Sequence, residues 1–319
     1  MTRQEMILSH FQKAQELVVT NTIYKDHITK LFAWMAQADR VDQDITSLVL
    51  SLKGEGKARI ISKQQGIAAG IEELVFLLKN NTSLTFSPLV TDGAVLAKED
   101  IVAEVSGKNT EILAYERTIL NILGRMSGIA TEANSLITSI SNIPNAPAIA
   151  AIRKTPLMML DKKAVAVGGG LTHRLHLADS ILIKDNHLLL LQRDLHLKSE
   201  ELGAEEAVRR SMQSQQQYFE IEVDTLLQAN AVLHTFVREN AKQKKPKMMA
   251  ILLDNFTSVE AKNFVDSLRK LLLYASVLIE ASGEITRDNV SEWATTGVDV
   301  VSLGALTHSA KVFNFSMSY

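Results

Sequence analysis

The sequence contains no cysteine, and this absence excludes several kinds of chemistry. Without cysteine there can be no disulfide, no thiolate metal site and no cysteine nucleophile. Long apolar runs are also missing, because no stretch reaches the roughly 18 residues that a membrane-spanning helix needs. The opening stretch MTRQEMILSHFQKAQELVV is interrupted by polar and charged residues every few positions, unlike a secretory signal. We therefore expect a cytoplasmic protein with no membrane partner.

An excess of either charge is lacking too. The 34 Lys and Arg residues nearly balance the 36 Asp and Glu residues, which leaves a net charge of −2. A chain without a basic surplus has little to neutralise a phosphate backbone, so no nucleic-acid partner is expected. The 46% hydrophobic and 22% charged residues are ordinary for a globular protein. A length of 319 residues supports one large domain or two ordinary ones.

Several catalytic motifs are absent as well. No Ser-His-Asp arrangement stands out, and no His spacing suggests a zinc site. There is no phosphate-binding P-loop and no Gly-x-Gly-x-x-Gly string after a strand. Any active site must therefore be assembled from residues that are far apart in the chain.

The first part of the chain predicts helices followed by a small α+β region. Residues 1–40 have helical spacing without Pro or Gly, and Asp44 is placed to cap a following helix. Short β-like pieces separated by Gly and Asp-Gly turns occupy residues 51–110. Residues 111–140 form a long amphipathic helix, for which Ser127-Gly128 is the candidate break.

The second part of the chain shows a regular repeat. Short apolar runs are separated by gaps that suit crossover helices, such as 203–213 and 258–273. This βα repeat predicts a parallel sheet, either open or closed into a barrel. The six runs are residues 148–152, 180–183, 219–223, 250–253, 277–281 and 299–303.

Each apolar run ends in chemically capable side chains. Because the carboxyl ends of parallel strands meet at one mouth, these side chains predict a large polar site there. Several cations in one mouth suit a substrate with more than one carboxylate or phosphate. Two separated carboxylates suit a divalent metal or ribose hydroxyls. The cationic or potentially cationic residues are Arg153, Lys154, His173, Arg174 and Lys184, the carboxylates are Glu222 and Asp254, and Ser282-Gly283 and Gly304 resemble phosphate-binding loops.

These residues lie in strings that resemble the quinolinate phosphoribosyltransferase family, also called carboxylating nicotinate-nucleotide diphosphorylases. The combination of GGGLTHRL, ILIKDNH and GALTHS is highly specific, and the likeness covers residues 41–319 in order. The other matching strings are ERTILNILGRMSGIAT, AIRKT, EIEVD, ILLDN and EASGEITRDNV. The resemblance implies an N-terminal α/β sandwich domain (1–127), an open parallel α/β barrel (128–308) and a C-terminal tail (309–319) that returns to the first domain.

The resemblance also implies a reaction and roles for individual residues. Quinolinate and phosphoribosyl pyrophosphate would give nicotinate mononucleotide, pyrophosphate and CO₂, with Mg²⁺ on the diphosphate. The resemblance further implies a homodimer or larger assembly with a shared active site, in which Arg117 completes the neighbour's site. The implied catalytic residues are Lys154, Lys184, Glu222 and Asp254, the last two also addressing the metal, directly or indirectly. The implied substrate-binding residues are Arg117, Arg153, His173, Arg174, Ser282, Gly283, Gly304 and His308.

Four departures from the family pattern keep other interpretations open. Ala151 replaces an acidic residue, His176 and Glu284 replace glycines, and the loop after Thr155 is about two residues short. One alternative is a related phosphoribosyltransferase for another pyridine or small acid, although such paralogues lack the KDNH string that this chain has. The other is a non-catalytic ligand-binding relative, against which the charged motif positions remain chemically competent. The alternative for Arg117 is an ordinary surface ion pair with Glu116 that has no role in a site.

Overall fold

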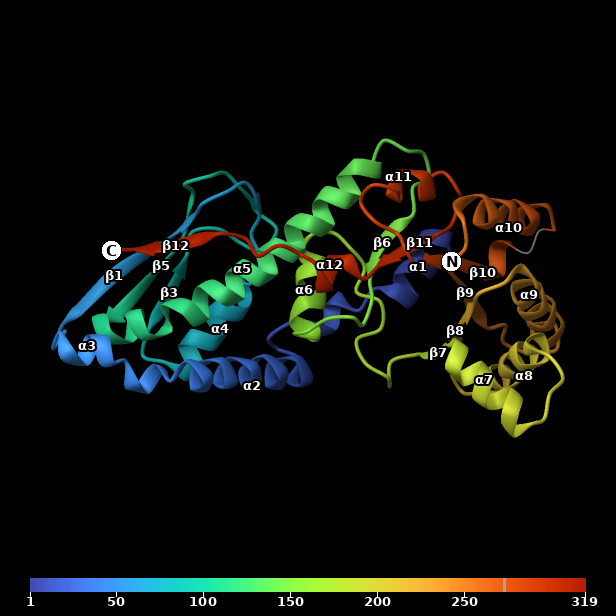
Figure 1. Cartoon of the computed structure of the whole chain (residues 1–319), viewed down its shortest axis with the longest axis horizontal. Coiled ribbons are helices and arrows are strands. Elements are labelled where there is room, and N and C mark those ends of the chain that lie inside the picture. The colour runs from blue at the N-terminus through green and yellow to red at the C-terminus, as the bar shows by residue number, and fades with distance from the viewer. Residues whose placement is uncertain (272–273) are drawn as a thin grey trace. The chain divides into compact units, whose positions relative to one another are not determined.

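The computed structural model describes residues 1–271 and 274–319 and divides the chain into two compact units (Figure 1). The parallel-sheet unit comprises Met1–Gln12, Leu136–Ile152 and His173–Leu303, and the antiparallel-sheet unit comprises Lys13–Ser135, Arg153–Thr172 and Gly304–Tyr319. Among the described residues, no helix combines the length and hydropathy needed to cross a membrane. The domain bounds at residues 127 and 308 stay a prediction, because these contact-based units are discontinuous in sequence.

The antiparallel-sheet unit is built on a four-stranded sheet with the order β12-β1-β5-β3. The last strand, β12 (Phe315–Ser318), lies beside β1 (Glu55–Ser62), so the C-terminal segment completes this sheet. Asp44 caps a short helix as expected, since its Oδ1 accepts the N–H groups of Thr46 and Ser47. The remaining early elements are η1 (Ala14–Glu16), α2 (Thr22–Asp39), η2 (Val41–Gln43), α3 (Ile45–Val49), β2 (Gly66–Ile67), α4 (Ile71–Asn81), β3 (Thr85–Pro88), β4 (Val95–Leu96) and β5 (Ile101–Lys108).

The long helix α5 (Asn109–Ile140) runs without interruption, so the candidate break at Ser127-Gly128 is wrong. The glycine has a packing role instead. A Cβ at Gly128 would lie 2.0 Å from the carbonyl oxygen of Lys311, so only glycine lets the C-terminal segment pass this close. Ser127 faces another segment, and its hydroxyl bonds both backbone groups of Ala69. Polar and small residues inside a helical pattern here mark close contacts.

The parallel-sheet unit contains a six-stranded sheet with the order β6-β11-β10-β9-β8-β7. All of its strand pairs are parallel, and the consecutive strands β6 and β7 lie at opposite edges, which makes the barrel open. The expected fold class is therefore confirmed, and every predicted apolar run overlaps a strand. The strands are β6 (Ala148–Ala151), β7 (Ile181–Ile183), β8 (Tyr218–Val223), β9 (Met248–Asp254), β10 (Val277–Ser282) and β11 (Val300–Leu303).

The predicted crossover helices follow these strands. Residues 203–213 lie in α8 (Glu200–Gln213), and most of 258–273 lies in α10 (Ser258–Lys270). Residues 272 and 273 of the second prediction lie outside the described residues. The other helical elements are α1 (Arg3–Phe11), α6 (Met159–Val167), α7 (Asp185–Asp194), α9 (Leu226–Asn240), η3 (Tyr274–Ser276), α11 (Val290–Trp293) and α12 (Ala305–His308).

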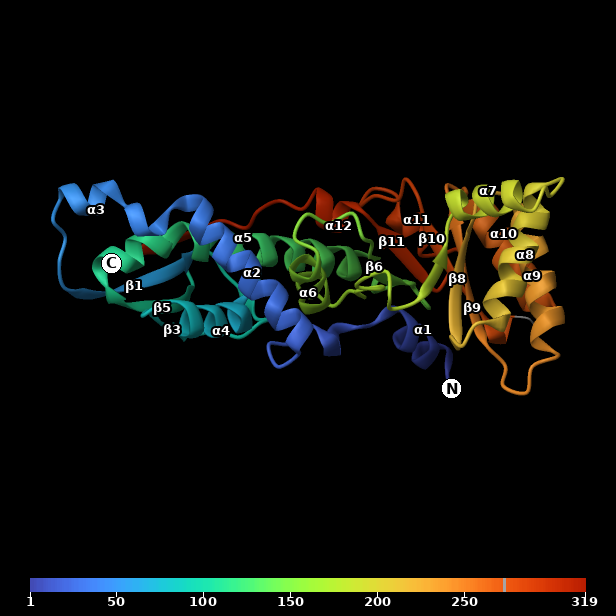
Figure 2. The same ribbon diagram turned by 90° about the horizontal axis from the view of Figure 1, so that it is seen from below.

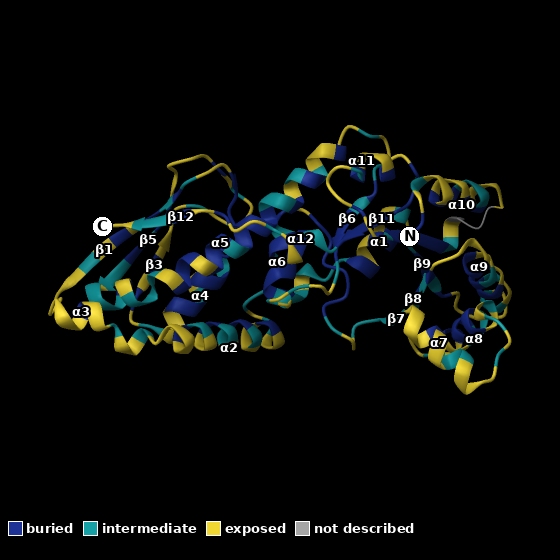
Figure 3. Ribbon diagram, in the orientation of Figure 1, coloured by how far each residue is buried: buried dark blue, intermediate teal, exposed yellow. Residues whose placement is uncertain are grey.

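The two faces of the parallel sheet have different partners. Helices α8, α9 and α10 lie on one face, and α1 lies on the other (Figures 1 and 2). Successive side chains of a strand alternate between faces, and β8 follows this rule. Phe219 packs against Phe236 of α9, whereas Tyr218 stacks on His10 of α1. The strand interiors are buried on both sides, as parallel sheets require (Figure 3).

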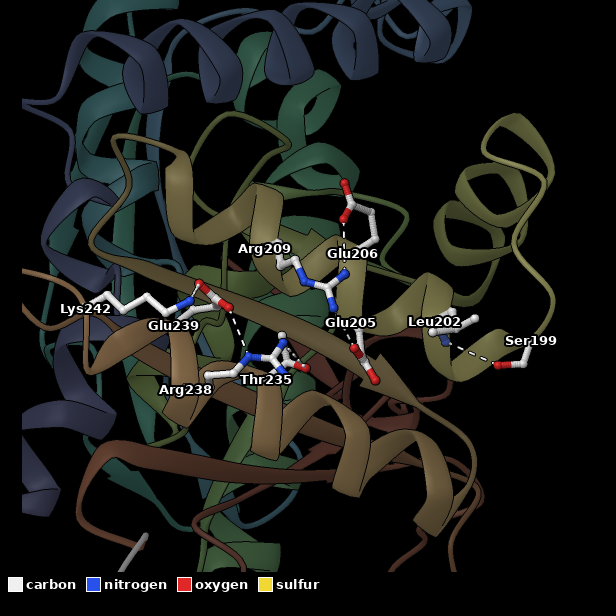
Figure 4. Close-up of polar contacts among 9 residues, drawn as sticks. All are labelled: Ser199, Leu202, Glu205, Glu206, Arg209, Thr235, Arg238, Glu239 and Lys242. Carbon is white, nitrogen blue, oxygen red and sulfur yellow. Dashed lines mark hydrogen bonds and ion pairs between the residues drawn. The ribbon is translucent and has the colours of Figure 1, made fainter.

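Residues of α8 and α9 carry ion pairs on their outer surfaces, most of them three or four positions apart (Figure 4). Arg209 contacts Glu205 and Glu206, and Glu239 contacts Arg238 and Lys242. Exposed pairs of this kind are each worth about 0–1 kcal/mol, so they mark a solvated surface rather than a source of stability. The chemistry of this unit must lie on other faces.

Candidate active site

The rim of the parallel sheet carries a close ion pair between two neighbouring strands. Lys184 directly follows β7, and Glu222 lies near the carboxyl end of β8. The register aligns Ile183 with Ile221, so the next residues along the two strands are neighbours. The Lys184 Nζ donates to Glu222 Oε2 at 2.6 Å, and the lysine side chain remains 46% exposed. A charged pair that stays open to solvent is available to a ligand.

A hollow of about 330 Å³ opens beside this pair. Carboxylates of Asp185, Glu222, Asp224 and Asp254 line it together with the amide of Asn255. Oxygen donors of this kind are the ligands that Mg²⁺ prefers, so the donor set fits that metal. Lys184 already neutralises part of the charge on Glu222, and the amide of Asn255 donates to Asp254 Oδ2 at 2.9 Å.

The loops after β9 and β10 are locked together at the same rim. Asp254 and Ser282 are partners in the register, and the N–H of Asn255 donates to the Ser282 carbonyl at 3.2 Å. Gly283 has a φ of +115°, and a Cβ there would lie 2.7 Å from Asn255 Oδ1. Glycine is therefore required at position 283 by both conformation and space.

His173 and Arg174 lie in the interior of this unit rather than at its rim. Both are buried, and His173 has a φ of +53°, a left-handed conformation that is unfavourable for a residue with a Cβ. The His173 Nε2 lies 3.3 Å from Glu220 Oε2 and 3.3 Å from Glu280 Oε2. Arg174 donates from Nη1 to the Ser180 carbonyl. A buried imidazole thus joins two buried carboxylates below the rim.

The three charged groups shift one another's pKa values. Burial raises the pKa of Glu220, Glu280 raises it further, and together they bring it to about 8. Burial also raises the pKa of Glu280, but His173, Glu220 and Ser302 together lower it, so the net shift is downward. Burial lowers the pKa of His173, whereas Glu280 and Glu220 raise it by a larger amount. The three groups therefore titrate as one interacting set.

The tautomer of His173 bears on whether this cluster could hold a metal. His173, Glu220 and Glu280 offer three ligand atoms within 4.8 Å of one another. However, the N–H of Arg174 donates to His173 Nδ1 at 2.7 Å, which needs an unprotonated Nδ1 and opposes the upward pKa shift of the ring. The Nε2 of the ring faces both carboxylates and carries a proton toward them, whether or not the ring is charged. Nε2 would have to lose that proton to bind a metal, so the cluster fits a hydrogen-bonded network better.

The other predicted residues belong to the antiparallel-sheet unit. Arg153 and Lys154 are exposed, and the Lys154 carbonyl accepts the hydroxyl of Thr307 at 2.8 Å. Gly304 precedes the short helix α12, whose last residue, His308, is exposed. Arg117 lies on α5 with its side chain 64% exposed, and its Nη2 is 3.8 Å from Glu116 Oε1.

The sequence interpretation missed a buried carboxylate that organises the segment around Lys154. Asp161 is fully buried and receives two hydrogen bonds from Arg125, at 2.9 and 2.8 Å. Its Oδ2 also accepts the hydroxyl of Thr155 at 2.6 Å, and Arg125 bonds the Thr307 carbonyl. No sequence signal distinguishes Asp161 from a solvated helical residue. Glu220 and Glu280 were also missed, although an acidic residue within an apolar strand is itself a signal.

The structure locates the departures from the family pattern. Ala151 is buried at the end of β6, and His176 pairs with Asp179 at 2.9 Å. Glu284 is exposed, and its carbonyl accepts the amide of Asn289 at 3.0 Å. Thr155 and the N–H of Leu157 both bond Asp161, which holds the shortened loop in place. None of these departures replaces Lys184, Glu222 or Asp254 at the rim.

An open parallel α/β barrel with charged side chains where its strands end is the arrangement of barrel enzymes. The family models for the quinolinate phosphoribosyl transferase N-terminal and C-terminal domains match residues 44–127 and 129–318. The chain belongs to this family, as its motifs predicted.

Individual relatives and a solved structure support the same family membership. A probable carboxylating nicotinate-nucleotide pyrophosphorylase of Archaeoglobus fulgidus is 34% identical over 263 residues, covering 82% of this chain and 93% of that protein. A decarboxylating quinolinate phosphoribosyltransferase of Nicotiana tabacum is 32% identical over 82% of this chain and 73% of its own length. The structure of the nicotinate-nucleotide pyrophosphorylase from Francisella tularensis superimposes with a TM-score of 0.74 at 28% identity, covering 92% of this chain and 96% of that one.

Proposed function

We propose that this chain transfers the phosphoribosyl group of phosphoribosyl pyrophosphate to quinolinate, giving nicotinate mononucleotide, pyrophosphate and CO₂. It is a pentosyltransferase of NAD biosynthesis, and its substrates are small molecules. The observation that carries the proposal is the Lys184–Glu222 pair beside Asp254, on strands that carry the family's KDNH, EIEVD and LLDN strings. An acidic hollow next to a solvent-facing lysine suits a sugar diphosphate with its metal beside an anionic ring.

The cations are assigned to the quinolinate carboxylates. Within one chain, the quinolinate carboxylates would be held by Arg153, Lys154, His173, Arg174 and Lys184. A planar guanidinium matches a carboxylate with two parallel hydrogen bonds, so the two arginines suit the two acid groups. Ser282, Gly283, Gly304 and His308 are assigned to the phosphate. Gly283 supports this assignment because its loop is fixed at the rim. The residue has no side chain, so its backbone is open to an approaching phosphate.

Mg²⁺ is assigned to the acidic hollow, where Asp254 and Glu222 would hold it, directly or through the diphosphate. When bound, the metal would neutralise negative charge on the leaving pyrophosphate. The carboxylates of Asp254 and Glu222 would also face the ribose, where positive charge develops as pyrophosphate leaves the anomeric carbon. Negative charge that is already in place beside the ribose lowers the activation free energy of the transfer, because the protein does not need to reorganise during the reaction.

The chemistry asks the protein mainly to position its substrates. The ring nitrogen of quinolinate attacks the anomeric carbon as the bond to pyrophosphate breaks. The carbon–carbon bond to the 2-carboxylate then breaks, CO₂ leaves, and the electron pair remains beside the cationic ring nitrogen until a proton replaces the carboxylate. No covalent enzyme intermediate is needed, so holding the two substrates in register accounts for much of the rate.

A homodimer in which Arg117 reaches the neighbour's site completes the proposal, together with a cytoplasmic location. Apolar side chains of α3, in the same unit as Arg117, support an interface there, because Ile45, Leu48 and Val49 are 71%, 76% and 74% exposed (Figure 3). Ile45 and Leu48 line a hollow of about 740 Å³, to which α5 contributes Thr110, Glu111, Ala114 and Tyr115. Clustered exposed apolar residues of this kind mark protein contacts.

Parallel assays with quinolinate, nicotinate and nicotinamide test the reaction. Quinolinate should release pyrophosphate and CO₂ with Mg²⁺, and nicotinate should react poorly, because a pocket for two carboxylates leaves cations unpaired when one is missing. Equal turnover of nicotinate and quinolinate would favour a paralogue for another pyridine. Binding of quinolinate without any pyrophosphate release would favour a non-catalytic relative.

Mixing two inactive variants tests the shared site. Arg117→Ala and Lys184→Ala proteins are unfolded and refolded together, so that half of the dimers are mixed. Each mixed dimer can collect both defects in one site and leave the other intact, which restores about a quarter of the wild-type activity. A mixture that stays inactive although mixed dimers form would show that Arg117 serves its own subunit or none.

A further inference from the structure

Helix α1 lies outside the matched family models, yet it reaches the buried His173 network. His10 is 6% exposed, and its Nε2 lies 3.4 Å from Glu220 Oε2. The same carboxylate oxygen lies 3.3 Å from His173 Nε2. The ring of His10 also stacks on Tyr218, two residues before Glu220 on β8. One glutamate therefore joins a histidine of α1 to the histidine of the substrate motif.

Helix α1 also holds the backbone of His173. The carbonyl of Phe11 accepts the N–H of His173 at 2.7 Å, and the two rings meet edge-on with centroids 5.2 Å apart. His173 is kept in a left-handed conformation that a residue with a Cβ adopts only when its surroundings enforce it. The hydrogen bond from the Arg174 N–H to His173 Nδ1 depends on that conformation. The next residue along is Arg174, whose side chain leaves the backbone directly after this turn and donates to the Ser180 carbonyl.

The helix is fastened at its other end as well. Arg3 forms an ion pair with Asp299, at the start of β11, and donates to the Val277 carbonyl at 3.0 Å. Asp299 Oδ2 in turn accepts the N–H of Ile279 at 2.7 Å. Contacts at both ends fix the helix against the inner face of the sheet, so that His10 and Phe11 cannot move independently of Glu220.

We propose that His10 is a positioning residue for quinolinate binding: through Glu220 and the turn at His173, it fixes the direction of Arg174. The inference rests on the proposed function, because Arg174 is assigned there to a quinolinate carboxylate. The other charged group that faces His173 is Glu280, and Tyr218 faces His10. The competing explanation is that His10 is an ordinary core residue whose loss only weakens the fold.

Three variants of α1 separate these explanations. His10→Phe keeps an aromatic ring against Tyr218 but removes the polar contact with Glu220. His10→Gln is the conservative rescue, because its amide nitrogen can again donate to that carboxyl group. Ile7→Ala is the matched control, since Ile7 is buried on the same helix and its truncation loosens packing without touching the network. Steady-state kinetics with quinolinate and with phosphoribosyl pyrophosphate are measured beside thermal unfolding.

The expected result is a selective change in KM. His10→Phe should raise KM for quinolinate about tenfold, because a misdirected Arg174 weakens the bound substrate and its transition state alike. Its kcat and its KM for phosphoribosyl pyrophosphate should stay within about twofold of wild type. His10→Gln should restore most of the quinolinate KM, and Ile7→Ala should lower the unfolding temperature but leave KM unchanged.

A double-mutant cycle adds a readout that a merely structural role would not move. In an Arg174→Lys background, His10→Phe should raise KM by less than about twofold, because coupled residues are not additive. A tenfold effect in both backgrounds, or an Ile7→Ala protein that shows the same KM change, would overturn the inference. Should His10→Phe fail to fold, His10→Leu is measured in its place, because it also removes the polar contact with Glu220, and the same KM change is expected. If the wild-type chain itself does not convert quinolinate, the proposed function fails first, and this inference fails with it.

Discussion

Two glutamates on one strand, Glu220 and Glu222, show how depth decides what a carboxylate does. They are two residues apart on β8, so they face the same side and lie roughly 6.6 Å apart along the strand. Glu220 is fully buried between His10 and His173, and its pKa is raised to about 8. Glu222 stays at the rim, paired with a lysine that is 46% exposed. One strand thus supplies an inner group that fixes geometry and an outer group that can meet a ligand.

The largest effect is expected at the rim. Lys184→Ala should lower kcat/KM for quinolinate at least about a hundredfold, because it removes a charge-assisted contact from the proposed pocket. The unfolding temperature should hardly change, since this side chain is half exposed and contributes little packing. Lys262→Ala, which removes an exposed lysine from α10, is the control for loss of a surface charge. Wild-type kinetics in a folded Lys184→Ala protein would remove Lys184 from the site.

A smaller effect is expected in the interior, and it concerns stability against pH. The pKa of Glu220 is raised in the folded protein, so the native state keeps a proton that the unfolded chain has lost. This stabilisation is fully present below the unfolded pKa near 4.5, and it is lost as the pH rises toward 8. Wild type should therefore lose stability relative to Glu220→Gln between pH 5 and pH 8.5, by on the order of a few kcal/mol.

Urea unfolding at several pH values measures this difference. Glu73 of α4 also has a pKa raised to about 7 by burial, but it is present in both proteins and cancels in the comparison. Glu222→Gln is the matched control for the loss of a glutamate from the same strand. Parallel curves for wild type and Glu220→Gln would contradict the contrast between the two glutamates.

The smallest effect is expected at Glu284, where the family pattern has glycine. A carboxylate facing a bound phosphate at about 4 Å would cost on the order of 4 kcal/mol even at an effective dielectric near 20. The side chain is exposed, and its backbone carbonyl is tied to Asn289. Glu284→Gly should change the KM for phosphoribosyl pyrophosphate by less than about twofold. A tenfold tightening would show that the carboxylate faces the phosphate.

The sequence predicted the rim of the parallel sheet better than its interior. Rim residues such as Lys184 and Glu222 follow apolar strands, and strand ends are visible as a change from apolar to charged letters. Interior residues depend on which strands are neighbours, and that order cannot be read from spacing. Glu220 and Glu280 are 60 positions apart, and they meet the same histidine only because β8 and β10 flank β9.

Close packing explains the other differences between expectation and structure. The break expected at Ser127-Gly128 came from residues that usually weaken helices, whereas Gly128 lets the segment at Lys311 approach. Asp161 gave no signal because its partner, Arg125, lies 36 positions away on another helix. Local patterns therefore located the elements, and long-range contacts decided which polar residues among them were buried.

The Arg3–Asp299 contact has a consequence for the order of folding during protein synthesis. The two residues are 296 positions apart, so α1 leaves the ribosome long before its binding surface exists. At about 5–20 residues per second, the helix waits roughly 15–60 s for β10 and β11. An amphipathic segment of nine residues is too short to hold its helical form alone in water. The helix that carries His10 is therefore expected to dock late, so a nascent chain would bring His10 to Glu220 only after the sheet itself is made.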